Sequence, residues 1–311
     1  MSDQKIAFVF PGQGSQAVGM LADLYESHEI VRQTFEQASD ALGYELSNLV
    51  LQGPVEELSK TEITQPALLA ASTAIYRLLT EQGAPAPALM AGHSLGEYSA
   101  LTSAGVISFE DAIKLVELRG KAMQQAVPQG VGAMAAIIGL DDAAVIQVCQ
   151  QASQDKIVAA VNFNSPGQVV IAGHKEAVEA ASALCKEAGA KRALPLPVSV
   201  PSHCELMKPA AQELASAMEN IQFSAASTPV VNNVDVKIET DATAIQQALV
   251  RQLYCPVRWT ETVQYLSAQG VTQLVEVGPG KVLNGLTKRI VKTLTAVSVN
   301  DQKSLESFIN G

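Results

Sequence analysis

Short apolar runs that end in turn-forming residues alternate along this chain with longer segments whose apolar positions recur at helical spacing. Runs this short are typical of strands buried inside a sheet; they span residues 5–10, 88–91, 228–234, 272–277 and 294–299. The helical segments span 29–42, 66–79, 108–123, 245–253 and 259–269, and Pro66 is expected at the first position of its helix. Strands that alternate with helices predict an α/β fold with a parallel sheet. Residues 300–311 carry no pattern that predicts an element.

Between residues 128 and 197 the alternation becomes shorter and more regular. Predicted strands at 134–139, 157–163, 168–173 and 191–196 enclose predicted helices at 141–152 and 174–188. This βαββαβ order is that of a ferredoxin-like unit. Glycine and proline residues mark both of its ends. We therefore expect a discontinuous core of residues 1–127 and 198–311, an inserted ferredoxin-like subdomain of residues 128–197, and a binding cleft between them.

The segment Gly92-His93-Ser94-Leu95-Gly96 has the Gly-x-Ser-x-Gly spacing of a nucleophile elbow. It follows the predicted strand 88–91 and precedes a predicted helix at 97–104, so Ser94 lies on a strand-to-helix corner. Glycines on both sides allow such a strained turn, and the N–H of Leu95 at the helix start favours an oxyanion on the serine. An ordinary turn is the alternative, but the strand-turn-helix context favours an α/β-hydrolase-like core with this elbow.

A second glycine loop follows the strand at residues 5–10. It lacks the third glycine of a dinucleotide-binding fingerprint, because Ala17 stands there. Its glycines allow the backbone of Gln13 to approach a ligand closely, so the N–H of Gln13 is a candidate second oxyanion donor. A plain turn explains this loop equally well.

His203 is the best candidate base among the four histidines of the chain. We expect a strand at residues 197–200, a loop at 201–203 and a helix from residue 205 to residue 218. His203 then lies at a strand end, and the loops at strand ends gather on the ligand-binding edge of an open α/β sheet. A purely structural histidine is the alternative.

Arg119 lies on the apolar stripe of the helix at 108–123, which Ser108 and Asp111 open as a capping box. The helix therefore directs a guanidinium inward, where a charge is costly unless it is paired. Two interpretations stay open. Arg119 is either a structural residue, ion-paired or reaching the surface with its head group, or a clamp for an anionic substrate.

Composition narrows the class of function. With 48% hydrophobic and 17% charged residues, the 311-residue chain has the composition of an ordinary α/β enzyme, without a membrane span or a signal peptide, so we expect a cytoplasmic protein. A formal charge of −10 argues against nucleic acid as a partner. Four cysteines without C-x-x-C spacing argue against a zinc site or a disulfide framework. The segment Gly278-Pro279-Gly280-Lys281 lacks the other residues of a phosphate loop.

Taken together, these motifs closely resemble the malonyl-CoA:acyl carrier protein transacylases, the malonyl-loading acyltransferases of bacterial fatty acid synthesis. The resemblance covers nearly the whole chain and rests on segments 11–16, 92–96, 162–167 and 276–280 together with Arg119, Ser202, His203 and Gln252. It implies that malonyl-CoA and an acidic acyl carrier protein are the partners, with no nucleic acid, membrane, metal or cofactor. It also implies a monomer.

The resemblance assigns roles to individual residues. Ser94 becomes the nucleophile, His203 the base and Arg119 the clamp for the malonate carboxylate. The backbone N–H groups of Gln13 and Leu95 become the oxyanion hole. The remaining implied substrate-site residues are Gln252, whose backbone carbonyl orients His203, and His93 and Asn162.

The sequence leaves three alternative functions open. A thioesterase or another serine hydrolase uses the same elbow chemistry. An acyltransferase of polyketide-type synthesis loads another acyl group: within the family Leu95 accompanies malonyl selection, whereas Ser202 also occurs in relatives that load branched units. A non-catalytic subunit that binds carrier protein or coenzyme A is the third, and the intact set of Ser94, His203 and Arg119 argues against it.

Overall fold

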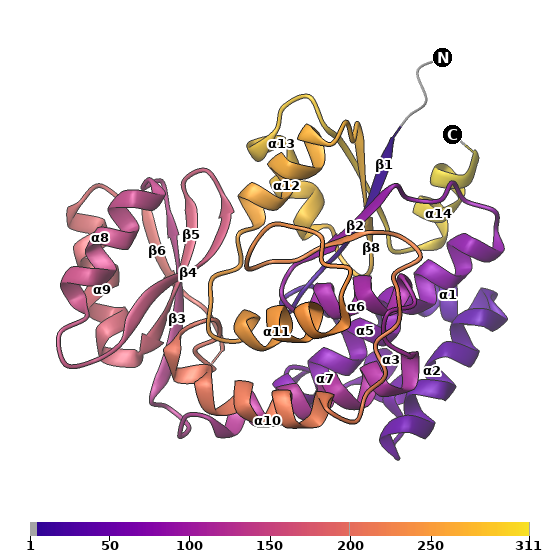
Figure 1. Cartoon of the computed structure of the whole chain (residues 1–311), viewed down its shortest axis with the longest axis horizontal. Helices are drawn as coiled ribbons and strands as arrows, with labels where there is room; N and C mark the ends of the chain where they lie inside the picture. The colour runs from indigo at the N-terminus through magenta and orange to yellow at the C-terminus, as the bar shows by residue number, and fades with distance from the viewer. Residues whose placement is uncertain (1–4, 199, 311) are drawn as a thin grey trace.

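A five-stranded parallel sheet in the order β7-β2-β1-β8-β9 forms the centre of the larger part of the molecule (Figure 1). The structure is a computed structural model that describes residues 5–198 and 200–310. The strands are β1 (Ile6–Phe10), β2 (Leu89–Gly92), β7 (Val230–Val231), β8 (Gln273–Val277) and β9 (Thr295–Val299). The predicted parallel sheet is confirmed.

Helices cover both faces of this sheet, and the alternation of side chains along β1 explains why. Phe8 and Phe10 pack into the larger apolar cluster, whereas Ala7 and Val9 pack into a second cluster on the opposite face. The larger cluster draws on α2 (Glu29–Leu42), α5 (Thr61–Glu81), α6 (Leu95–Ser103), α7 (Phe109–Gln125), α10 (Lys208–Met218) and α11 (Ala242–Gln252). The second draws on α12 (Trp259–Ala268) and α13 (Val282–Ile290).

Shorter helices complete the core on the side of the larger cluster. They are α1 (Ala22–Ser27), α3 (Leu46–Gln52), α4 (Val55–Leu58), the 3₁₀ helix η1 (Glu205–Met207) and α14 (Gln302–Asn310). Within the described residues, no helix is both long enough and apolar enough to cross a lipid bilayer.

The second sheet is antiparallel, has the order β4-β5-β3-β6, and lies with its helices at one end of the molecule (Figure 1). Its elements are β3 (Gly132–Ile138), α8 (Asp142–Ala152), β4 (Val158–Ser165), β5 (Gln168–His174), α9 (Lys175–Glu187) and β6 (Arg192–Pro195). The ferredoxin-like strand order is confirmed. One face packs on α8 and α9, and Met134 on the other face packs near Cys204 of the core. The boundaries at residues 128 and 197 stay predictions.

Two local predictions are wrong, and one segment without a prediction forms a helix. The helix predicted from Pro66 begins five residues earlier, at Thr61, so Pro66 lies inside α5. The strand predicted at 197–200 does not form at residues 197, 198 or 200, and residue 199 lies outside the described residues. The unassigned C-terminal segment forms α14, whose Leu305 is buried against the larger cluster.

Candidate active site

Ser94 occupies the corner between β2 and α6 with a strained backbone. Its φ of 52° and ψ of −107° lie in a region that residues with a side chain rarely adopt. A Cβ on Gly92 would lie 1.8 Å from the backbone of Gly96, and a Cβ on Gly96 would lie 2.0 Å from the carbonyl oxygen of Phe10. Both flanking positions therefore require glycine because α6 crosses directly over β1 and β2.

His203 meets Ser94 across 109 residues of sequence. Its Nε2 lies 2.8 Å from the Oγ of Ser94. The expected placement at a strand end is wrong, because the preceding segment forms no strand among its described residues. Instead the loop is held by α11: the N–H of His203, a residue with φ of 65°, donates to the carbonyl of Leu253 at 3.0 Å.

The tautomer of His203 follows from its second hydrogen bond. Nδ1 lies 2.7 Å from the backbone carbonyl oxygen of Gln252, and a carbonyl can only accept, so Nδ1 carries the hydrogen. Burial, followed by the charge of Arg119, lowers the pKa of His203 to about 3. The ring is therefore neutral at pH 7, and the lone pair of Nε2 faces the hydroxyl of Ser94.

Arg119 is 1% exposed and reaches the nucleophile. Its Nη2 donates to the Oγ of Ser94 at 3.2 Å and to the Oε1 of Gln252 at 3.0 Å, and its Nη1 donates to the Oε1 of Gln65 at 2.8 Å. Its Nε has no hydrogen-bond partner among the residues that the structure describes. Within residues 5–198 and 200–310 no carboxylate forms an ion pair with Arg119, and the guanidinium does not reach the surface. A buried cation therefore stands beside the serine without a counter-ion in contact.

One cavity of about 110 Å³ brings most of the expected site residues together. The core contributes Gln13, His93, Ser94, Leu95, Arg119 and His203, and the antiparallel sheet contributes Met134 and Asn162. The cavity therefore lies between the two sheets. Gln252 does not line it and acts on it through hydrogen bonds with His203 and Arg119.

Three polar residues of the site, Asn233, Gln65 and Glu97, gave no functional signal in the sequence, and a fourth, Asn164, entered only as part of the segment 162–167. Asn233 accepts the N–H of Ser94 at 2.7 Å and donates to the carbonyl of Gly92 at 2.6 Å. Asn164 lies 2.8 Å from Nε2 of His93, and Gln65 holds Arg119 as described above. Glu97 is buried, and burial raises its pKa to about 7. A signal that could have found Glu97 is its charge, because it is the only charged residue of the predicted helix at 97–104.

This geometry can activate a serine for attack on an acyl group, and the buried cation can pair with an acyl group that carries its own negative charge. In the described part of the chain no group of three or more His, Cys, Asp or Glu side chains could hold a metal ion. The sequence profile of the acyl transferase domain matches residues 7–307. The chain belongs to the acyl transferase family.

The relatives of this acyl transferase carry more specific names. It is 67% identical over 305 residues to the malonyl CoA-acyl carrier protein transacylase of Escherichia coli (strain K12), with 98% of this chain and 99% of the relative covered. It is 68% identical to the protein of that name from Haemophilus influenzae, with 98% of each chain covered.

Two solved structures are about as similar to this chain as these relatives are. An acyl carrier protein S-malonyltransferase from Vibrio cholerae is 66% identical, with a TM-score of 0.96 and coverage of 97% of this chain and 99% of that one. A malonyl-transacylase solved in complex with a type II polyketide synthase acyl-carrier protein is 65% identical, with a TM-score of 0.97 and coverage of 98% and 99%.

Proposed function

We propose that this acyl transferase moves a malonyl group from malonyl-CoA to the phosphopantetheine thiol of an acyl carrier protein, and so supplies extender units for fatty acid synthesis. The names of its relatives support this assignment. The observation that carries it is the buried guanidinium of Arg119, which stands 3.2 Å from the Oγ of Ser94 and has no ion-pair partner in the described residues. A malonyl group bound to Ser94 brings the missing carboxylate.

In the first half-reaction the Oγ of Ser94 attacks the thioester carbonyl while Nε2 of His203 takes the hydroxyl proton. The oxygen of the tetrahedral intermediate is stabilised by the N–H groups of Gln13 and Leu95. The C–S bond then breaks, His203 returns the proton to the departing sulfur, and free coenzyme A leaves a malonyl ester on Ser94.

In the second half-reaction the carrier thiol gives its proton to His203 and attacks the ester carbonyl of malonyl-Ser94. The C–O bond breaks and His203 returns the proton to Ser94, so the cycle is ping-pong. Every step uses residues of the chain and the two thiols. We therefore infer that the reaction needs no cofactor, because the coenzyme A thioester is itself a substrate. The cytoplasmic location and the monomeric state stay predictions.

Incubation with labelled malonyl-CoA, without any acceptor thiol, tests this assignment. Peptide mapping is expected to find one label, on Ser94, and Ser94→Ala is expected to remove it while the protein stays folded. Ser99→Ala is the matched control, because Ser99 is a buried hydroxyl on the same helix. Label on a cysteine contradicts the proposal. Steady release of coenzyme A without an acceptor identifies a thioesterase instead.

A further inference from the structure

Two side chains hold the strained backbone of Ser94, one on each side. Oδ1 of Asn233 accepts its N–H at 2.7 Å, and Nε2 of Gln252 donates to its carbonyl oxygen at 3.1 Å. Asn233 lies in the loop after β7, and Gln252 is the last residue of α11. The conformation of Ser94 therefore depends on two segments that are distant from the elbow in sequence.

A single carboxylate oxygen joins Asn233 and Gln252, which we call the inner clamps of Ser94. Oε2 of Glu97 accepts the backbone N–H of Asn233 at 3.0 Å and Nε2 of Gln252 at 2.8 Å. Glu97 is 2% exposed and lies in the first turn of α6, directly after the elbow. The helix that begins at the nucleophile thus fixes both of the residues that hold the nucleophile.

Gln252 connects this carboxylate to the reacting groups. Its backbone carbonyl accepts Nδ1 of His203, and its side-chain Oε1 accepts Nη2 of Arg119. The amide could be turned over only by placing its NH₂ against the guanidinium and its oxygen against the carboxylate of Glu97. Glu97 therefore determines which end of the Gln252 amide faces Arg119.

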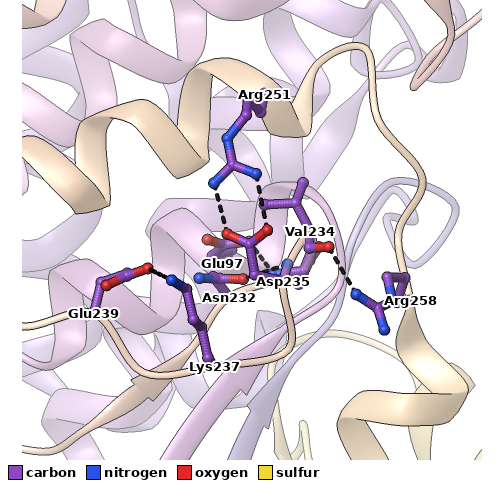
Figure 2. A network of polar contacts seen from close by, with 9 residues as sticks. Glu97, Asn232, Val234, Asp235, Lys237, Glu239, Arg251 and Arg258 are labelled. Carbon is purple, nitrogen blue, oxygen red and sulfur yellow. Dashed lines mark hydrogen bonds and ion pairs between the residues drawn. The ribbon is translucent and has the colours of Figure 1, made fainter.

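A partly buried ion pair joins the same two segments on their outer side. Figure 2 shows Arg251 reaching Asp235 through two hydrogen bonds, of 2.8 Å and 2.6 Å. Arg258 holds the same loop through the carbonyl of Val234 at 3.2 Å (Figure 2). Arg251 directly precedes Gln252 in α11. The outer contacts keep the loop and the helix together, so a change at Glu97 acts on the orientation of the inner clamps.

We propose that Glu97 is a positioning residue for acyl transfer, which sets the geometry of Ser94 and His203 by holding Asn233 and Gln252 with one oxygen. The inference rests on the proposed function, because its measure is the acylation of Ser94. Glu97 touches neither the acyl group nor the reacting atoms. Its loss slows acylation by acetyl groups as well as by malonyl groups, in contrast to the loss of Arg119.

The test compares the acylation of Ser94 by malonyl-CoA and by acetyl-CoA in the wild type, Glu97→Gln and Glu97→Met. Gln keeps an oxygen that can accept both hydrogen bonds, whereas Met fills a similar volume without an acceptor. We expect the saturating acylation rate to fall by about tenfold in Glu97→Gln and by about 100-fold in Glu97→Met. Acylation by acetyl-CoA is expected to slow as well as acylation by malonyl-CoA, and the malonyl factor is expected to be at least as large because Gln252 also holds Arg119; KM for acetyl-CoA is expected to stay nearly unchanged.

Glu276 supplies the matched control. It is a carboxylate of equal burial, 1% exposed, that accepts the backbone N–H groups of Leu283 at 3.1 Å and Asn284 at 2.8 Å, away from the active-site cavity. Glu276→Gln and Glu276→Met are expected to lower the unfolding temperature and to leave the acylation rate unchanged at a temperature where they stay folded. This control separates a loss of buried polar contacts from a loss of positioning.

The Nδ1 proton of His203 gives a second readout, because its NMR frequency reports the hydrogen bond to Gln252. We expect this frequency to move in Glu97→Gln and to stay in Glu276→Gln. Three outcomes overturn the inference. The Glu97 variants acylate as fast as the Glu276 variants, or their loss is confined to KM, or the Nδ1 proton resonance of His203 does not move. If Glu97→Met does not fold, Glu97→Gln and its resonance decide. Absence of malonyl-Ser94 in the wild type overturns the proposed function instead.

Discussion

The Nδ1 atom of His203 lies 2.7 Å from the backbone carbonyl oxygen of Gln252. In a Ser-His-Asp triad a carboxylate takes this position and stabilises the imidazolium that forms when the serine loses its proton. A neutral carbonyl stabilises that cation less. Burial, followed by the charge of Arg119, keeps the pKa of His203 near 3, although the hydrogen bond to this carbonyl raises it. The resting ring is therefore neutral at pH 7.

This low pKa has a consequence for stability. His203 binds a proton below pH 6.5 in the unfolded chain, whereas in the folded protein it does so only near pH 3. Its contribution is therefore complete above pH 6.5 and is lost as the pH falls from 6.5 towards 3. Between pH 7 and pH 5 the free energy of unfolding of the wild type is expected to fall by about 2 kcal/mol relative to that of His203→Gln. Urea unfolding of both proteins at each pH measures this difference, and parallel losses contradict the prediction.

The contribution of Glu97 to stability is expected to depend on pH with the opposite sign. Burial raises its pKa from 4.5 in the unfolded chain to about 7, against the opposing hydrogen bonds of Gln252 and Asn233 and the charge of Arg119; Asp235 adds to the rise. Its stabilising contribution is complete below pH 4.5 and is lost as the pH rises through 7. As the pH rises from 4.5 to 8, the free energy of unfolding of Glu97→Gln is therefore expected to increase by on the order of 3 kcal/mol relative to that of the wild type. The check is again urea unfolding, and an unchanged difference between the two proteins contradicts this pKa.

A variant that is more stable at pH 8 and yet acylates more slowly also shows that the slower rate does not come from unfolding. The two measurements together separate the role of Glu97 in positioning from its role in folding.

The elbow could be predicted from sequence because its determinants are local. The spacing of Gly92, Ser94 and Gly96 reports a steric requirement between adjacent elements. Arg119 could be singled out for a similar reason, since its position on an apolar helix face is a property of one segment. The ferredoxin-like unit followed from the order of short periodic segments. Each of these signals lies within a short window of sequence.

The resemblance placed Gln252 in the site, but the hydrogen bonds that hold Ser94 could not be predicted, because they span 139 residues for Asn233 and 158 for Gln252. A single asparagine after a short strand is typical of any loop. The placement of His203 shows the same limit. The histidine was chosen correctly as the partner of Ser94, but the argument from a strand end was wrong, since contacts with α11 hold its loop.

Gly96→Ala tests the steric origin of the elbow. Helix propensity alone predicts that alanine at a helical position stabilises the protein by about 0.5–1 kcal/mol. At Gly96 the new Cβ would lie 2.0 Å from the carbonyl oxygen of Phe10, so we expect lower stability and a loss of acylation of at least about 100-fold. Gly285→Ala is the control, because Gly285 is helical and its Cβ would meet nothing within 4 Å. Thermal unfolding is expected to shift in opposite directions in the two variants.

Carrier docking requires local positive charge on a chain with a formal charge of −10. Lys288 and Arg289 are exposed in the last turn of α13 and are the candidates for contact with an acidic carrier. Lys288→Glu combined with Arg289→Glu is expected to raise the KM for the carrier several-fold, without a change in the KM for malonyl-CoA. Added salt is expected to reproduce the effect in the wild type. Lys303→Glu, at an exposed position on α14, is the control. A KM for the carrier that does not change with salt concentration contradicts this prediction.

We expect Arg119 to decide between malonyl and acetyl groups, because a methyl-ended acyl group leaves the buried guanidinium unpaired. Loss of one partner of such a buried pair typically costs about 2–5 kcal/mol, so Arg119→Ala is expected to lower malonyl transfer by roughly 30-fold to several thousand-fold. Arg119→Lys keeps the charge but loses the planar fork, and is expected to recover only part of the rate. Acetyl transfer is expected to fall far less, or to rise.

The decisive quantity for Arg119 is therefore the ratio of malonyl to acetyl acylation rates on Ser94, which depends on the carboxylate of the substrate and cancels general effects on the nucleophile. Arg77→Ala is the control for loss of an arginine, because Arg77 is partly buried and bonded to Thr34 and Gln37, outside the active-site cavity. The ratio is expected to stay constant in Arg77→Ala and to collapse in Arg119→Ala. An unchanged ratio with lower stability would make Arg119 a structural residue and would remove the main physical reason for malonyl selection.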